Sequence, residues 1–179
     1  MSPFDVLVDY ERRSLAHVAG LPEELDAQGL WRGVGYRIGA RRLASEFGEV
    51  REILTVPQIT LVPGTQPWML GVANVRGSLL PIVDLKQFLE GERTVLHESL
   101  RVLLVRQPGG DVAVLVDELF GQRSFTEQQQ MPEDEAAEVL AQGRYQHFID
   151  RGYRLGEHTW GVFSLDRLAR TPEFRQAAT

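Results

Sequence analysis

The stretch from Thr65 to Leu89 constrains the fold of this chain more than any other. Apolar residues dominate two strand-length runs, at 72–75 and 79–83, and Arg76, Gly77 and Ser78 lie between them. A glycine that is free to adopt positive φ between two apolar runs is typical of a β-hairpin turn. We therefore predict a β-hairpin that displays an arginine at its tip.

Pro81 and Asp84 define how this hairpin continues. Pro81 has no N–H for a strand ladder, so its strand is expected at a sheet edge, at a bulge, or with that position facing away from its neighbour. Asp84 precedes apolar positions 85, 88 and 89, with Gln87 three residues later, which is a helix-capping pattern. Gly91 is a typical helix stop. The hairpin is thus predicted to lead directly into a helix of about two turns.

Composition places the chain among ordinary globular proteins. The 179 residues are 43% hydrophobic and 25% charged, enough for one or two modest cores. A formal net charge of −6 disfavours nucleic acid or an anionic membrane as the main partner. The absence of cysteine excludes disulfides, thiol catalysis and thiolate metal sites. No apolar run has the length of a membrane span, and the first residues lack a signal pattern, so we expect a cytoplasmic protein without direct membrane insertion.

One domain is expected over residues 31–170, flanked by two other segments. Residues 1–30 are predicted to be a helical extension and linker, because apolar residues recur there at near-helical spacing until a glycine and a proline end the pattern. This extension either packs on the main domain or docks a partner. Residues 171–179 are expected to form a C-terminal tail.

From Trp31 onward the apolar pattern has the period of two that is typical of strands. A turn is predicted at 39–42, a return strand from Leu43, a single turn leading into a strand at 47–54, and further strands at 102–105 and 112–119. A loop is predicted at 124–131 and a helix at 132–142. The last segment, 153–168, repeats the order hairpin, capping residue and short helix, which predicts two similarly built lobes. Short strands with Gly/Pro turns favour closed β-barrels.

The hairpin and several neighbouring segments resemble the signature of the CheW-like domain family, the coupling modules of bacterial chemosensory arrays. The resemblance covers Pro67-Trp68, Gly71 to Gly77, Leu80 to Leu85, the segment Val50 to Ile53, and, more weakly, Leu115 to Asp117. It implies a mainly β fold: two packed SH3-like five-stranded β-barrel lobes with short helices, segments exchanged between the lobes, and here an N-terminal helical extension. The lobe boundary stays open.

The resemblance also implies a non-catalytic adaptor. Its partners would be the cytoplasmic tip of a methyl-accepting chemoreceptor and the regulatory domain of a CheA-like histidine kinase. The implied receptor-binding residues are Asn74, Arg76 and Gly77, and the implied kinase-binding residues are Val50, Glu52 and Ile53. A weak surface ion pair is the alternative role for Arg76, although a guanidinium suits a protein interface. Trp68 and Trp160 are expected to be core anchors.

Part of the sequence indicates one particular pathway, control of type IV pilus twitching motility, and two alternative functions remain open. Three features resemble the family members that control this motility. They are the N-terminal extension, the residue sequence of the hairpin, and the C-terminal segment with Trp160 to Ser164 followed by Thr171 to Phe174. A flagellar-type chemotaxis coupling protein is the first alternative. A free-standing β-barrel that binds a small ligand or an oligonucleotide is the second, and the acidic charge without an aromatic and basic stripe speaks against nucleic acid.

Catalysis is not supported by the side-chain pattern. The four histidines are scattered, with no two at helical metal-binding spacing (His17, His97, His147 and His158). Asp84 and Asp117 each follow an apolar strand, and a helix cap and a strand-end turn explain them without chemistry. No phosphate loop and no nucleophile-elbow motif occurs. We expect no cofactor, no metal and no enzymatic activity.

Overall fold

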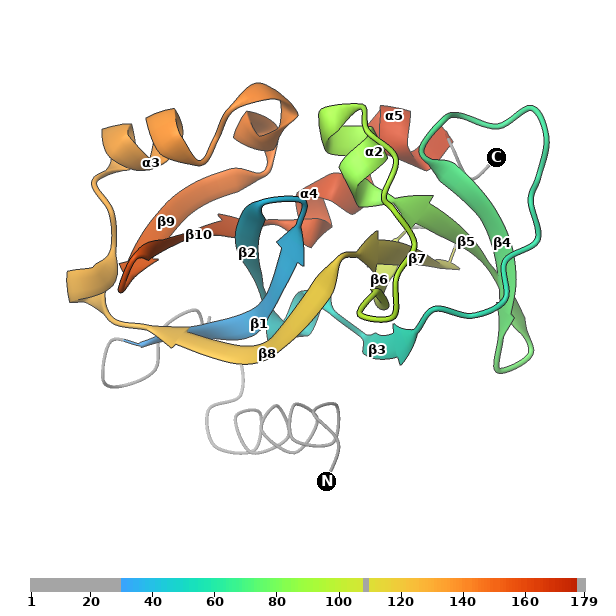
Figure 1. Cartoon of the computed structure of the whole chain (residues 1–179), viewed down its shortest axis with the longest axis horizontal. Coiled ribbons are helices and arrows are strands. Elements are labelled where there is room, and N and C mark those ends of the chain that lie inside the picture. Colours follow the sequence, from blue (N-terminus) through green and yellow to red (C-terminus); the bar gives the residue numbers. More distant parts are fainter. Residues whose placement is uncertain (1–29, 108–109, 177–179) are drawn as a thin grey trace.

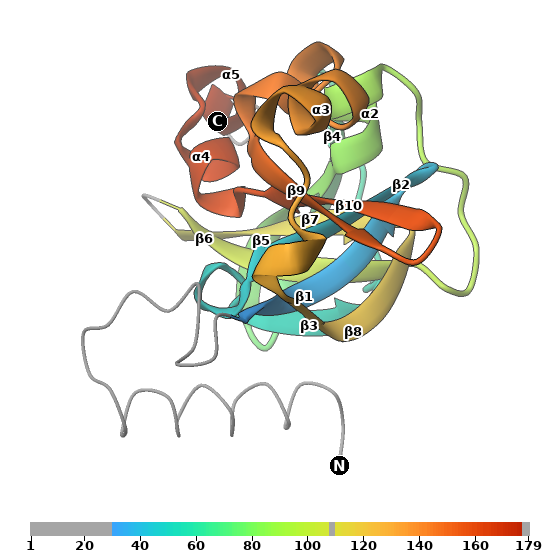
Figure 2. The same ribbon diagram turned by 90° about the vertical axis from the view of Figure 1, so that its left-hand side faces the viewer.

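The computed structural model describes residues 30–107 and 110–176. Within these ranges ten strands form two five-stranded sheets that lie side by side, and short helices cover one side of both (Figures 1 and 2). The predicted N-terminal extension lies outside the described residues except for Leu30. The mainly β architecture of two lobes is confirmed.

The first sheet has the strand order β8-β1-β2-β10-β9. Neighbouring strands are antiparallel except β2 and β10, which are parallel. The central hairpin β1–β2 is therefore flanked by a second hairpin, β9–β10, on one side and by a single edge strand on the other. The bounds are β1 (Trp31–Ile38), β2 (Arg41–Glu46), β8 (Glu118–Phe125), β9 (Ile149–Leu155) and β10 (His158–Phe163).

The second sheet repeats this plan with the order β3-β6-β7-β5-β4. Here the central hairpin is β6–β7, the flanking hairpin is β4–β5, and β5 and β7 form the parallel pair. The predicted internal repeat is thus present in the topology. The bounds are β3 (Glu52–Thr55), β4 (Met69–Val75), β5 (Ser78–Asp84), β6 (Arg101–Gln107) and β7 (Gly110–Val116).

Each flanking hairpin leads into a helix, as predicted. The first hairpin enters α2 and the second enters α4, and each helix begins directly after its capping residue. The remaining helical segments are connections between strands or follow the last strand. The bounds are η1 (Phe47–Glu49), α2 (Leu85–Glu90), η2 (Glu127–Gln129), α3 (Glu133–Val139), η3 (Gly143–His147), α4 (Leu165–Arg170) and α5 (Pro172–Gln176).

The second sheet is built from the consecutive strands β3 to β7, which are inserted in the chain between β2 and β8 of the first sheet, so the expected exchange of segments is not seen among the described strands. β3 follows β2 of the first sheet in the chain but pairs with β6 of the second, and β8 follows β7 of the second sheet but pairs with β1 of the first. The chain therefore crosses between lobes at residues 47–51 and at Asp117, which gives the boundary that the sequence left open. The strand order of each sheet is open at both ends, so the lobes are SH3-like but the predicted closure into barrels is not seen in the described residues.

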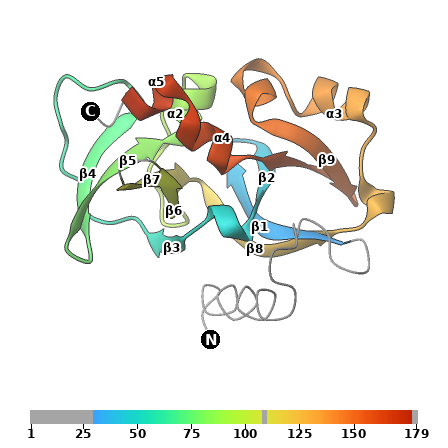
Figure 3. The ribbon, with the colours of Figure 1, turned by 180° about the vertical axis from the view of Figure 1, so that it is seen from behind.

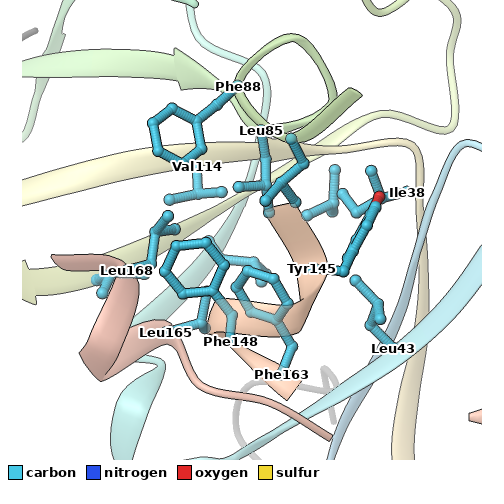
Figure 4. Packing of buried hydrophobic residues seen from close by; sticks show 14 of the residues in the cluster. Ile38, Leu43, Leu85, Phe88, Val114, Tyr145, Phe148, Phe163, Leu165 and Leu168 are labelled. Atoms are coloured by element: carbon cyan, nitrogen blue, oxygen red, sulfur yellow. The ribbon is translucent and has the colours of Figure 1, made fainter. Parts of the chain in front are cut away.

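The largest hydrophobic cluster is shared by both sheets. Leu43 of β2 and Phe163 of β10 meet Val114 of β7 there, and helices α2 and α4 add further side chains (Figure 4). Helix α5 also joins this core, since Phe174 is buried and its ring centroid lies 5.5 Å from that of Phe88. Residues expected to belong to a tail therefore contribute to the core. Because burial of apolar surface is shared, the lobes stabilise one another.

Pro81 lies in β5, between two neighbouring strands. Its partner across the hairpin is Val72, whose N–H and C=O both bond to Thr60 instead, at 2.9 and 2.8 Å. Pairing of β5 with β7 begins only at Ile82. The missing N–H of Pro81 therefore removes no ladder bond. Of the three alternatives given above, the position that faces away from its neighbour is the one observed, since β5 is not an edge strand.

Two local predictions are wrong. One strand at 112–119 and a loop from Ser124 were predicted, but β7 ends at Val116 and residues 118–125 form a separate long edge strand. This strand continues past Phe120 because a register shift between Gly35 and Tyr36 leaves Phe120 without a partner in β1, and Gly121 takes a φ of 83°. The turn after β1 is shorter than predicted, and β2 begins at Arg41. Arg41 is held in the strand by contacts of its guanidinium, which donates to Leu140 O at 2.9 Å and lies over the Tyr145 ring.

Candidate partner-binding site

The tip of the β4–β5 hairpin is a tight two-residue turn. Val75 pairs with Ser78, and Arg76 and Gly77 between them have φ values of 53° and 84°. Positive φ at both central positions is the requirement of a type I′ turn, whose twist matches that of the strands. The Oδ1 atom of Asn74 accepts a hydrogen bond from the Gly77 N–H at 3.0 Å. The hairpin with an arginine at its tip is confirmed.

Arg76 forms an ion pair with Glu52 of β3. β3 and β4 are the two outer strands of the second sheet, so the curvature of the sheet brings its edges together at this point, and the tip reaches the level of β3 in Figure 1. The Arg76 side chain is 70% exposed, whereas the Glu52 side chain is only 12% exposed. One residue from each predicted binding set therefore meets here.

The other two residues of the predicted kinase-binding set are less accessible. Val50 and Ile53 are half-buried and pack against the shared core. Val50 also lines a cleft of about 1080 Å³ whose walls come from η1, β6, β10 and α4. The structure thus places Val50 and Ile53 at the margin of the lobe junction, whereas Asn74, Arg76 and Gly77 lie together in solvent.

Leu79 adds an aliphatic side chain to the hairpin that the sequence analysis did not single out. It pairs with Asn74 across the two strands and is 68% exposed. In the sequence it belongs to a continuous apolar run, which gives no sign of which member faces solvent.

Glu49 is a second residue that the sequence did not reveal. Its Oε2 accepts hydrogen bonds from the Asp166 N–H at 2.8 Å and from the Ser164 hydroxyl at 3.3 Å. The segment that enters β3 is thereby tied to the first turn of α4, and Figure 3 shows η1, in cyan, below that helix. Burial raises the pKa of the Glu49 carboxyl, and the hydrogen bonds it accepts offset part of this rise.

Asp84 and Asp117 hold structure together instead of forming an acid pair. Asp84 is buried, caps α2 by accepting from Gln87 N, and accepts from both N and Oγ1 of Thr94, at 2.8 and 2.6 Å. Asp117 accepts from Gly39 N at 2.6 Å and contacts His97 Nε2 at 3.4 Å. Both carboxylates are engaged in fixing loops where the chain turns between strands. The predicted cap is confirmed.

The tryptophans chosen as core anchors are buried. Trp68 is 8% exposed and Trp160 is 4% exposed. The ring of Trp68 meets that of Phe88 edge-to-face, with centroids 5.2 Å apart. Their place in the core, predicted from the sequence, is confirmed, so neither offers a free surface for a ligand.

Residues 30–107 and 110–176 contain neither a metal-binding cluster nor a membrane-spanning helix. No three histidine, aspartate or glutamate side chains there are grouped closely enough to hold a metal ion. No helix in that part of the chain has the length and apolar character needed to cross a membrane. Fold and site together define a two-lobed β protein whose distinctive exposed feature is a rigid hairpin with an arginine at its tip.

Residues 32–173 match the CheW-like domain, and this chain belongs to that family. The chain is 41% identical over 180 residues to Protein PilI of Pseudomonas aeruginosa, an alignment that covers 99% of this chain and 97% of that protein. It is 27% identical to the chemotaxis protein CheW of Klebsiella aerogenes, over 77% of this chain and 81% of that one. The crystal structure of the scaffolding protein TtCheW from Thermoanaerobacter tengcongensis shares the fold, with a TM-score of 0.62 at 17% identity, over 74% of this chain and 87% of that chain.

Proposed function

We propose that this chain is a non-catalytic coupling protein that bridges the cytoplasmic tip of a methyl-accepting chemoreceptor and the regulatory domain of a CheA-like histidine kinase. Membership of the CheW-like family supports this function. The observation that carries it is the exposed, conformationally fixed Arg76 at the hairpin tip. The protein would act by burying interfaces and holding its partners in a set geometry, without making or breaking covalent bonds.

The receptor surface of this proposal comprises Asn74, Arg76 and Gly77, and the kinase surface comprises Val50, Glu52 and Ile53. The ion pair between Arg76 and Glu52 supports an arrangement in which the two surfaces adjoin. A receptor carboxylate or amide that takes the guanidinium would replace Glu52 as its partner. Binding at the tip would in this way change the charge presented by β3.

We further propose that the pathway served is type IV pilus twitching motility and that the protein acts in the cytoplasm. Support comes from the similarity to Protein PilI, which extends over 99% of the chain and so includes most of the residues before position 32, where the match to the CheW-like domain begins. A flagellar-type coupling role is the competing outcome. Titration with receptor tips and kinase domains from the two kinds of pathway in one organism separates these roles.

The site assignment is tested by calorimetric titration of the full chain with a chemoreceptor cytoplasmic-tip peptide and, separately, with a kinase regulatory domain. We expect Arg76→Ala to weaken binding of the tip roughly tenfold, as truncation of an interface arginine commonly does. Its fold should stay intact, because Arg76 is 70% exposed and lies outside the hydrophobic core, and circular dichroism of the variant checks this. Arg154→Ala is the matched control, an exposed, ion-paired arginine on β9. Wild-type affinity of Arg76→Ala for both partners would contradict the assignment.

A further inference from the structure

The turn at the hairpin tip requires an unfavourable backbone conformation at Arg76. This arginine has φ 53°, and it is the non-glycine residue with positive φ in the described part of the chain. The left-handed region costs an ordinary L-residue about 1–2 kcal/mol. Asparagine or glycine is the usual occupant of the first position of a type I′ turn. An arginine held there needs neighbouring groups that favour this conformation.

Asn74 is such a neighbour. Its carboxamide oxygen accepts the Gly77 N–H at 3.0 Å, which links the end of β4 to the second residue of the turn. Side-chain oxygens of Asn and Asp commonly stabilise turns by bonding backbone N–H groups further along the chain. Gly77 acts in the same direction: an added Cβ would meet no atom within 4 Å, so a glycine is required by its φ of 84° and not by crowding.

The backbone and the head group of Arg76 are therefore fixed by different residues. Asn74 and Gly77 set the backbone, and Glu52 orients the guanidinium. The oxygen of Asn74 accepts a hydrogen bond within the turn, which fixes the orientation of its short side chain along the hairpin. Of the three residues assigned to the receptor surface, Arg76 alone presents a long side chain with hydrogen-bond donors directed away from its own backbone.

We infer that Asn74 is a positioning residue that acts through Arg76 and makes no contact with the receptor that contributes to affinity. The inference rests on the proposed function, because it concerns the same surface. It separates the residues that the resemblance groups together: Asn74 and Gly77 set the conformation, and Arg76 makes the contact. The partner group it implies is a hydrogen-bond acceptor, a carboxylate or amide oxygen, placed to receive the guanidinium.

The first test uses the free full-length protein and needs no partner. In Asn74→Ala we expect the HN–Hα coupling of Arg76 to change and the Gly77 amide to exchange with solvent several times faster, measured by NMR. Asn74→Asp keeps an acceptor oxygen and should preserve both signals. Ser78→Ala, a neighbouring exposed residue of the hairpin, is the matched control. Unchanged coupling and exchange in Asn74→Ala would overturn the positioning role.

The second test is a double-mutant cycle in binding of a receptor cytoplasmic-tip peptide. Asn74→Ala should lower affinity about threefold to tenfold in the wild-type background, the range expected for one lost hydrogen bond, and less than twofold in the Arg76→Ala background. Asn74→Asp should restore binding. An equal loss in both backgrounds would mean that Asn74 contacts the receptor directly and would overturn the inference. If Arg76→Ala itself binds normally, the proposed receptor surface fails, and the free-protein signals alone decide the role of Asn74.

Discussion

Arg76 belongs both to a turn and to a contact between the two edges of a sheet. Its ion pair with Glu52 is largely open to solvent on the arginine side. Glu52 is only 12% exposed, so a partner that offers its own carboxylate must offset the cost of leaving Glu52 without the guanidinium. The turn, by contrast, keeps the arginine backbone fixed, and less freedom is then lost when a partner binds.

Trp68, which directly precedes β4, is expected to contribute to stability through its burial. We expect Trp68→Ala to lower the free energy of unfolding by about 3–5 kcal/mol, since removal of a buried aromatic side chain leaves a cavity. Urea denaturation monitored by circular dichroism measures this change. Leu79→Ala, which truncates an exposed side chain, is the control and should change stability by less than about 0.5 kcal/mol. A Trp68 variant as stable as the control would show that the ring is not part of the core.

Glu49 predicts a pH dependence of stability. Burial raises its pKa above the ordinary 4.5, so the folded chain holds this proton more tightly than the unfolded chain does. The stabilisation is complete below the ordinary pKa and is lost as pH rises through the raised folded-state pKa. Glu49→Gln removes the titration while keeping an acceptor oxygen.

We therefore expect the difference in unfolding free energy, wild type minus Glu49→Gln, to fall as the pH rises from about 4 to 7. Urea titrations at several pH values provide the measurement. A difference that is independent of pH would show that folding leaves the pKa of this carboxyl unchanged, and one that grows with pH would show that folding lowers it; either result contradicts the prediction.

At the scale of elements, the two hairpin-to-helix units are the parts that the sequence predicts best. Their information is local: a glycine in the turn, a capping residue at Asp84 or Ser164, and apolar positions on one face of the following helix. The extent of β8 could not be predicted, because Gly121 and a register shift interrupt its alternation.

The candidate site shows the same division. The rigid tip follows from local residues, but the contact of Arg76 with Glu52 depends on how far the second sheet curves. The hydrogen bond from Ser164 to Glu49 joins residues 115 positions apart and depends on the parallel pairing of β2 with β10, whose ends these two residues follow. Neither contact leaves a pattern in the sequence. The residues of the candidate site could be named from the family resemblance alone, but their contacts with one another could not.

The two capping residues are predicted to differ in importance. Asp84 is buried and accepts from Gln87 and twice from Thr94, so Asp84→Ala should cost about 2–4 kcal/mol by leaving several donors unpaired. Ser164→Ala removes a cap in a more exposed position and should cost about 1 kcal/mol. Urea denaturation of both variants provides the comparison. Equal costs would contradict the view that Asp84 also anchors the loop after α2.

At the scale of the whole molecule, two chain crossings and a shared core make the lobes one unit. The second sheet is inserted in the chain between β2 and β8 of the first, and the core between the sheets includes side chains of both. We expect a single calorimetric unfolding transition, with equal calorimetric and van't Hoff enthalpies. Leu168→Ala, in the shared core, should shift that transition to lower temperature without splitting it. Two separable transitions would mean that the lobes fold independently.

A single rigid unit suits a protein that holds two partners at a fixed separation. Sedimentation velocity of a mixture of receptor tip, kinase regulatory domain and this chain tests that claim most directly. We predict that the receptor tip and the kinase domain sediment together only when this chain is present, and that Arg76→Ala releases the receptor tip while the kinase domain stays bound. The account would be contradicted if neither partner sediments with the chain, or if the receptor tip and the kinase domain sediment together equally well without it.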